Sequence, residues 1–270
     1  MHKLKKIMSI CFSLFMVVTA AVAGTLAFEN LSAEEWAQWA LENDQTIVVE
    51  LLQQQRSYDE NGALTGLELF EDYKVLVPLA GSAQYDGTNF DKYGLPMAEG
   101  YVDQIVRVTN TGTADAYVRV IVAVPAALDD ANDAGHNALH WNLGNRFMEN
   151  GSFTAENSVN GAFDKISWDY SQTAEVEGVM CNIYVFTYTE PLTARTTTEA
   201  AAFVGFYLDS SVDILDGYIM LDGVNTGFQN DSVKIHVEAQ AVQSYGMGSS
   251  AEAAFATANM TENPWAEDTA

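Results

Sequence analysis

Apolar and polar residues alternate along two stretches, 106–109 and 117–124, that flank a short polar segment. Alternation with a period of two is typical of a β-strand that buries one of its faces. The segment between them contains Asn110 and Gly112, which tolerate the backbone conformations of tight turns. Pro125 ends the second stretch, because proline has no N–H to donate to a strand ladder. The pattern therefore predicts a β-hairpin over 106–125.

Other runs of strand length occur along the chain, bounded by Gly, Pro, Asn or Asp. They lie at 46–52, 67–77, 166–170, 179–189, 201–208, 212–221 and 233–242. No regular alternation of strands with long helices separates these runs. The sequence therefore predicts an all-β fold, an antiparallel β-sandwich with a few short helices.

Two short helices are expected near the ends of the chain. In 28–44, Ser32 and Glu35 have the spacing of a capping box, and two tryptophans fall on one face. A second helix is predicted from Ser249 or Ser250 to Ala258. Residues 259–270 are expected to form a tail.

The first 23 residues have the organisation of a secretory signal peptide. A basic start is followed by an apolar run over 7–22 and by a cleavage pattern that ends at Ala23, with a second possible site at Ala27. An uncleaved membrane anchor is the alternative, although the run is short for a membrane span. We therefore expect a secreted protein with a signal peptide (1–23), an N-terminal arm (24–60) and one β-sandwich domain (61–270).

Charge and cysteine content narrow the functional classes. The chain has 37 acidic and 12 basic residues and a formal charge of −25, which argues against binding to nucleic acid. Cys11 lies within the predicted signal peptide, so the mature chain keeps Cys181 alone and is held by its apolar core and not by an internal disulfide. Within an apolar run, Cys181 is expected to be a small buried side chain.

Candidate metal ligands are few. His136 and His140 would share one face of a helix and could bind Zn²⁺, but Asn137 stands where a zinc peptidase has its general base. The acidic segment 129–135 has the composition of a calcium loop without its spacing. A solvated acidic loop is the better interpretation, so we expect no cofactor, with zinc and calcium left as alternatives. Four aromatic residues, which could line a sugar-binding face or fill the core, are Tyr101, Trp141, Trp168 and Tyr170.

Several motifs occur in an order typical of one family. Residues 24–28, GTLAF, resemble the junction cut by a dedicated SipW-type signal peptidase. Residues 108–120, VTNTGTADAYVRV, resemble a segment of the exported proteins that this peptidase processes; its characteristic positions are Asn110, Gly112, Asp115, Tyr117 and Arg119. Later matches follow at 184–192, 204–209 and 237–246. The chain thus resembles the TasA/camelysin-like group of Gram-positive surface and matrix proteins.

This resemblance implies a jelly-roll-like sandwich and assembly into extracellular fibres, in which an N-terminal strand of one subunit completes a sheet of the next. The expected partners are further copies of the chain or a homologous fibre subunit, together with the signal peptidase. The candidate donor lies within 24–52, where 46–52 has the stronger β-pattern. We expect a secreted, non-enzymatic structural protein of the cell surface or biofilm matrix. A camelysin-like surface metallopeptidase and a monomeric ligand- or carbohydrate-binding module are the alternatives.

Overall fold

The structure is a computed structural model that describes residues 46–71, 74–79, 91, 93, 95, 97–129, 137–141 and 165–269. The predicted signal peptide, both cleavage positions Ala23 and Ala27, the predicted helix at 28–44 and His136 lie outside these residues. Among the residues described, no helix has both the length and the apolar character needed to cross a membrane.

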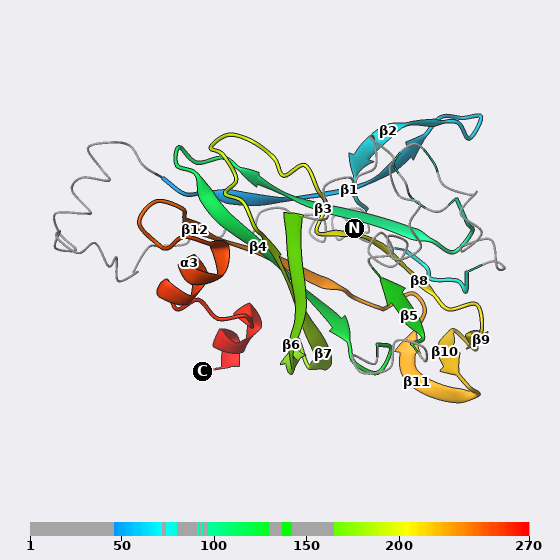
Figure 1. The fold of residues 1–270 in the computed structure, drawn as a ribbon. Helices are drawn as coiled ribbons and strands as arrows, with labels where there is room; N and C mark the ends of the chain where they lie inside the picture. The colour runs from blue at the N-terminus through cyan, green and yellow to red at the C-terminus, as the bar shows by residue number, and fades with distance from the viewer. Residues whose placement is uncertain are drawn as a thin grey trace, which may run out of the picture.

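Two antiparallel sheets form the body of the protein (Figure 1). The five-stranded sheet has, in spatial order, β2 (Leu64–Leu69), β1 (Val49–Tyr58), β3 (Val102–Asn110), β8 (Phe203–Leu208) and β5 (Leu139–Trp141). The four-stranded sheet has β12 (His236–Gln243), β4 (Ala116–Pro125), β7 (Val179–Tyr188) and β6 (Ile166–Val176). A small third sheet contains β11 (Val224–Gln229), β10 (Tyr218–Leu221) and β9 (Asp213–Leu215). The predicted antiparallel β-sandwich is confirmed.

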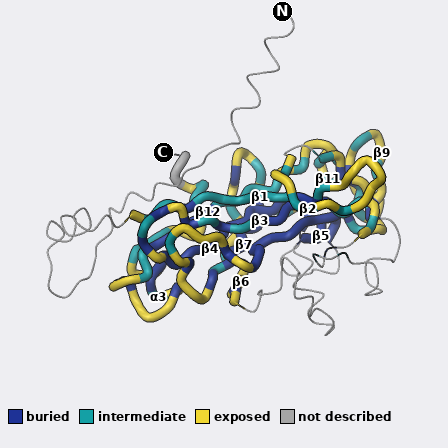
Figure 2. The backbone as a smooth tube through the Cα atoms, turned by 90° about the horizontal axis from the view of Figure 1, so that it is seen from above, coloured by how far each residue is buried: buried dark blue, intermediate teal, exposed yellow. Residues whose placement is uncertain are grey.

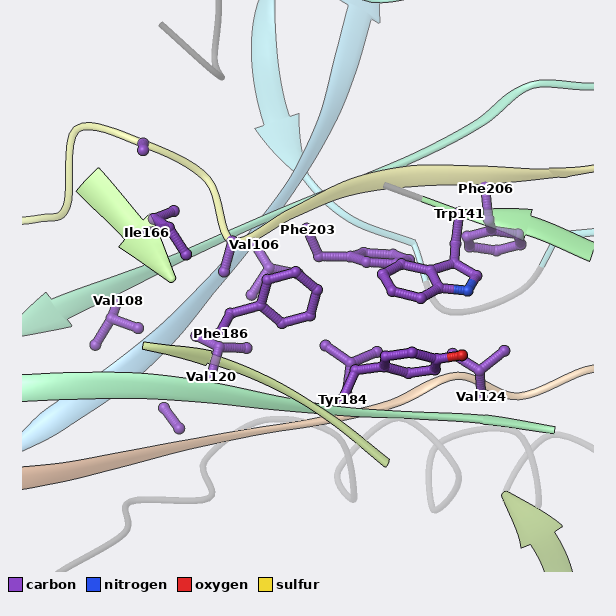
Figure 3. Packing of buried hydrophobic residues seen from close by; sticks show 14 of the residues in the cluster. Val106, Val108, Val120, Val124, Trp141, Ile166, Tyr184, Phe186, Phe203 and Phe206 are labelled. Carbon is purple, nitrogen blue, oxygen red and sulfur yellow. The ribbon is translucent and has the colours of Figure 1, made fainter. Parts of the chain in front are cut away.

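Buried residues line the space between the two large sheets (Figure 2). Phe186 and Tyr184 from β7 face Phe203 and Trp141 from the five-stranded sheet, and their rings fill the middle of the core (Figure 3). All ten residues of β4 are buried, because β12 and β7 flank it and both of its faces are covered. Strand β4 is therefore a central strand and not the half-exposed strand that its alternation suggested.

The predicted hairpin over 106–125 is wrong, although both of its strands form. Strand β3 pairs with β1 and β8, whereas β4 pairs with β12 and β7 in the other sheet. Residues 111–115 therefore connect the two sheets, and we call them the arch. Alternation is a local signal, so it identified the strands without identifying their partners.

The described part of the predicted arm belongs to the sandwich. Strand β1 pairs with β3 from Val49 to Gln54 and with β2 from Gln54 to Tyr58. Residues 49–58 thus lie inside the five-stranded sheet of their own chain, and the strand predicted at 46–52 is longer and begins later. A donor segment that is free of the domain must precede Thr46.

Two other expectations change. The strand predicted at 67–77 ends at Leu69, because Leu76 instead exchanges hydrogen bonds with Asn230 near the end of β11. The strand predicted at 212–221 is split, since Asp216 and Gly217 both have positive φ and turn the chain between β9 and β10.

The C-terminal helix is confirmed as α3 (Ala251–Thr257), where the Ser250 hydroxyl accepts a hydrogen bond from the Ala253 N–H. The expected tail is wrong. Residues 260–262 are bonded to the four-stranded sheet, and a 3₁₀ helix, η4 (Pro264–Thr269), follows with Trp265 packed against that sheet.

Candidate functional site: the arch and its neighbours

The arch is shaped by Asn110, whose side chain is completely buried. Its Nδ2 donates to the carbonyl oxygens of Ala114 and Leu192, at 2.8 and 3.2 Å, and its Oδ1 accepts from the Gly112 N–H at 3.0 Å. The amide thus closes the arch on itself and ties it to the segment after β7. An asparagine suits this position because one side chain supplies both donors and an acceptor.

The arch also holds the point where the chain enters the sandwich. The N–H groups of Thr113 and Ala114 donate to the Thr46 carbonyl at 2.9 and 3.0 Å, and the Thr111 N–H donates to the Val48 carbonyl at 2.8 Å. In return, the Thr46 N–H donates to the Thr113 hydroxyl at 2.9 Å. Gly112 permits this approach, since a Cβ there would lie far inside van der Waals contact with the Thr46 carbonyl.

Asp115 joins the arch to two further segments. Its Oδ1 accepts a hydrogen bond from the Ala194 N–H at 2.8 Å. Its carbonyl oxygen accepts from the N–H and hydroxyl of Ser244, at 3.1 and 3.0 Å, just beyond β12. Asp115 therefore acts as a structural acceptor, although its side chain is exposed.

Tyr117 and Arg119 contact the C-terminal segment. Tyr117 packs in a cluster with Phe255 and other residues of α3 and its flanks. The Arg119 guanidinium lies 4.4 Å from the centre of the Phe255 ring, which is cation–π geometry. Its Nε donates to Gln240 Oε1 at 2.8 Å, and one terminal nitrogen donates to the carbonyls of Met260 and Thr261 at 3.2 and 2.8 Å.

Burial dominates the electrostatics of Arg119. The side chain is 5% exposed, and its ion pair with Glu262 is loose, at 3.6 Å, with Glu262 half-exposed. Burial lowers the pKa of Arg119 and the Glu262 carboxylate opposes that effect only in part. Because the cation depends on neutral oxygens and an aromatic face, the C-terminal segment cannot leave without exposing or stranding it.

His140 occupies the opposite end of the core, on β5. Its Nε2 lies 2.8 Å from Asp209 Oδ2, and its ring stacks on that of Tyr207 at 4.9 Å between centroids. Ser211 donates from its hydroxyl to the other Asp209 oxygen at 2.7 Å. Burial raises the pKa of Asp209, but hydrogen bonds from Ser211 and from His140 outweigh it and leave that pKa lowered. The serine touches the aspartate and not the histidine, so the order of contacts differs from that of a catalytic triad.

Asp129, from the proposed calcium segment, is a buried acceptor. Its Oδ1 accepts from Asn137 Nδ2 at 2.9 Å and from Trp141 Nε1 at 3.1 Å, and its Oδ2 accepts from Asn182 Nδ2 at 3.0 Å and from the Tyr184 hydroxyl at 2.6 Å. Burial, followed by the nearby Asp129 carboxylate, raises the pKa of Tyr184. Both carboxylate oxygens are thus occupied by protein donors. Sequence reasoning missed this role, because the partners come from β7, from β5 and from the residue Asn137 just before β5.

No group of three or more His, Cys, Asp or Glu side chains able to hold a metal ion occurs within the described ranges. The zinc hypothesis needs His136, which lies outside them. Of the four aromatic candidates, Trp168 is 41% exposed, Trp141 is buried, and Tyr101 and Tyr170 are half-buried. Cys181 is fully buried, and burial raises its pKa to about 11, as expected of a packed thiol and not of a nucleophile.

The motif residues therefore converge on one place, where the arch meets the chain entry, the segment after β7 and the C-terminal segment. His140 and Asp129 lie apart from it, beyond the other end of β4. A comparison of the chain with protein-family models, curated proteins and solved structures finds no match.

Proposed function

We propose that this chain is a secreted, non-enzymatic structural protein of the cell surface or biofilm matrix. Copies assemble into fibres when the arm that precedes Thr46 in one copy adds a strand to a sheet of the next. Addition of a strand to an open sheet edge supplies main-chain hydrogen bonds, and pockets for alternate side chains supply specificity. The export pattern and the motif order of the sequence support this proposal.

The arch is the observation that carries the proposal. Its backbone N–H groups donate to the carbonyls of Thr46 and Val48, and the side chains of Asn110 and Asp115 bond to backbone groups of neighbouring segments. Because Thr46 and Val48 are held by the arch, the segment that precedes Thr46 could pair with another copy while the sandwich stays folded. The same residues offer no pairing of nucleophile, base and open cavity that catalysis would need.

Deletion of residues 24–45 from the mature protein tests the proposal. Electron microscopy should show filaments of the parent chain at high concentration and none of the variant. The deletion must stop before Thr46, because removal of β1 would take a central strand out of the five-stranded sheet. A circular dichroism melt like that of the parent would establish that the shortened chain is folded.

Two results would overturn the proposal. Filaments formed equally well without 24–45 would exclude the arm as donor. A parent chain that stays monomeric at every concentration, with its N-terminus confirmed by mass, would exclude self-assembly and leave the binding module as the better account. Stoichiometric zinc in the purified parent, together with chelator-sensitive proteolysis, would instead establish the peptidase alternative.

A further inference from the structure

We propose that a cavity at the end of the four-stranded sheet, opposite the arch, binds a small neutral phenol. The ring lies against the apolar part of the wall, and the hydroxyl group forms a hydrogen bond with His236. This site goes beyond the proposed function, because it takes a small molecule and plays no part in the assembly of copies. The size, the walls, the charge and the unused hydrogen-bonding capacity of the cavity all favour this class of ligand.

The cavity has a volume of about 160 Å³ and lies where β4 ends and where β7 and β12 begin. Pro125, the last residue of β4, pairs with Cys181 of β7, and His236 is the first residue of β12, which flanks β4 on its other side. Besides Pro125, the wall comes from within 177–181 and 228–236. All of these residues are described by the structure.

The apolar part of the wall suits an aromatic ring. It consists of Pro125, Val179, Cys181 and Phe228, of which Cys181 is completely buried. Sulfur atoms and aromatic side chains both make favourable contacts with aromatic rings. An engineered apolar cavity of about 150 Å³ binds benzene, so the volume found here is sufficient for a single six-membered ring.

Four polar side chains complete the wall, and three of them are already engaged. Lys234 Nζ lies 3.1 Å from Glu177 Oε2, and both side chains are mostly exposed, so this ion pair lies at the mouth of the cavity. Ser232 donates its hydroxyl to a backbone carbonyl at 3.2 Å. His236 packs against the edge of Trp265, with 6.2 Å between ring centroids, and it has no hydrogen bond or ion pair with a described residue. Its hydrogen-bonding capacity is therefore available to a ligand.

The cavity carries no net charge at neutral pH. The charges of Glu177 and Lys234 compensate each other. Burial lowers the pKa of His236 against the attraction of Glu177, so the imidazole is neutral and has one donor and one acceptor nitrogen. Burial also raises the pKa of Cys181 to about 11, so the thiol keeps its proton. A neutral ligand is favoured, because an unpaired charge is costly to bury.

Water and a metal ion are poorer occupants than a phenol. A buried water needs two to four polar partners, whereas His236 is the one lining side chain with unused capacity. Glu177, Cys181 and His236 all line the cavity, but no group of three such side chains able to hold a metal ion occurs among the described residues. A thiol must also lose its proton to bind a metal, which burial opposes at Cys181.

The first test compares the binding of phenol and benzene to the full mature chain by isothermal titration calorimetry near neutral pH. We expect one saturable site per chain, with phenol bound roughly two- to tenfold more tightly, which is the effect of one hydrogen bond. His236→Leu should remove this preference and keep the binding of benzene. Equal affinities of the parent for the two ligands would overturn the role of His236, and the absence of saturable binding of either ligand would overturn the site.

The second test locates the site. Ser232→Trp adds a large side chain to the wall of the cavity from an exposed position, and Ser210→Trp, which is exposed and outside the cavity, is the matched control. We expect Ser232→Trp to weaken phenol binding by about tenfold or more and Ser210→Trp to leave it unchanged. Equal binding by the two folded variants would overturn the inference.

A measurement on the parent chain keeps the proposal testable if Ser232→Trp does not fold. In the complex with phenol, nuclear Overhauser effects should connect the ring protons of phenol with the methyl groups of Val179, which lines the cavity. Their absence, or effects that involve methyl groups outside the cavity alone, would overturn the inference.

Discussion

Two buried charges mark the opposite ends of β4, and they hold different parts of the chain. Arg119, near the start of the strand, binds Gln240, Met260 and Thr261, which are 121 to 142 residues away in sequence. Asp129, just past the end of the strand, binds side chains 8 to 55 residues away, on or beside β5 and β7. In both networks most of the hydrogen-bond partners of the buried charged group are neutral.

The two networks differ in what they stabilise: the Asp129 network lies in the core of the domain, and the Arg119 network attaches the C-terminal segment to it. The Asp129 network joins strands of both large sheets, so it belongs to the cooperative unit that unfolds as a whole. The Arg119 network fastens a terminal segment onto a sheet that is complete without it. Regions that are held by few contacts open at lower free energy than the core does. Damage at Asp129 should therefore unfold the domain, whereas damage at Arg119 should release mainly the C-terminal segment.

Asp129→Ala is expected to have the largest effect on stability, because it removes the centre of the core network. The substitution leaves four buried donors without their acceptor, and each such loss destabilises by about 1–3 kcal/mol. We expect a decrease of roughly 3–5 kcal/mol in the free energy of unfolding, measured by urea denaturation, with a single cooperative transition. Glu175→Ala, at an exposed position of β6, is the control and should change stability little. A decrease at Asp129 of under about 1 kcal/mol would contradict the assignment of this residue to the core.

Gly112→Ala tests the arch. The added methyl group would collide with the Thr46 carbonyl, so either the arch or the chain entry has to move, at a loss of about 1–3 kcal/mol. Faster proteolysis near residues 46–48, at a reduced melting temperature, is the expected result. At Gly66 in β2 a Cβ meets nothing within 4 Å, so Gly66→Ala is the matched control. Equal effects of the two substitutions would refute the role given to Gly112.

Arg119→Lys tests whether the C-terminal segment opens separately from the core. Lysine keeps the charge but loses the planar fork that reaches Gln240 and two carbonyls together. We expect a loss of about 2 kcal/mol and faster hydrogen exchange of residues 255–262 relative to β4. Uniformly faster exchange throughout the domain would show that the C-terminal segment is part of the core.

Asp209→Asn should have the smallest effect on the free energy of unfolding, and this effect should depend on pH. The pKa of Asp209 is lowered in the folded protein, so the folded state binds fewer protons here than the unfolded state. Its contribution to stability is therefore complete above the ordinary aspartate pKa, about 3.9, and disappears as pH falls through the lower folded value. The difference in stability between parent and variant, about 1 kcal/mol at pH 7 for a buried His140 and a partly exposed Asp209, should shrink towards pH 3. A difference that grows on acidification would show the opposite sign of the shift.

Local signals in the sequence were sufficient for most elements of the fold. Apolar patterning identified β4, β7, β8 and β12 to within a few residues. A helix was correctly expected to begin at Ser249 or Ser250, and Ser250 is its N-cap. These features depend on neighbouring residues, for which side-chain periodicity and capping chemistry are direct physical causes.

The residues of the arch were also identifiable from the sequence, although their roles were not. Asn110 and Gly112 were expected to turn a hairpin, yet they join two sheets and grip Thr46 and Val48, because strand pairing depends on residues far away in the chain. The partners of Arg119 and Asp129 were invisible for the same reason. The sequence by itself determined the all-β class, the place of most of the long strands and the short C-terminal helix. Only the tertiary structure decided which strands pair, which edges stay open and which charges are buried, since these depend on contacts between segments that no local pattern connects.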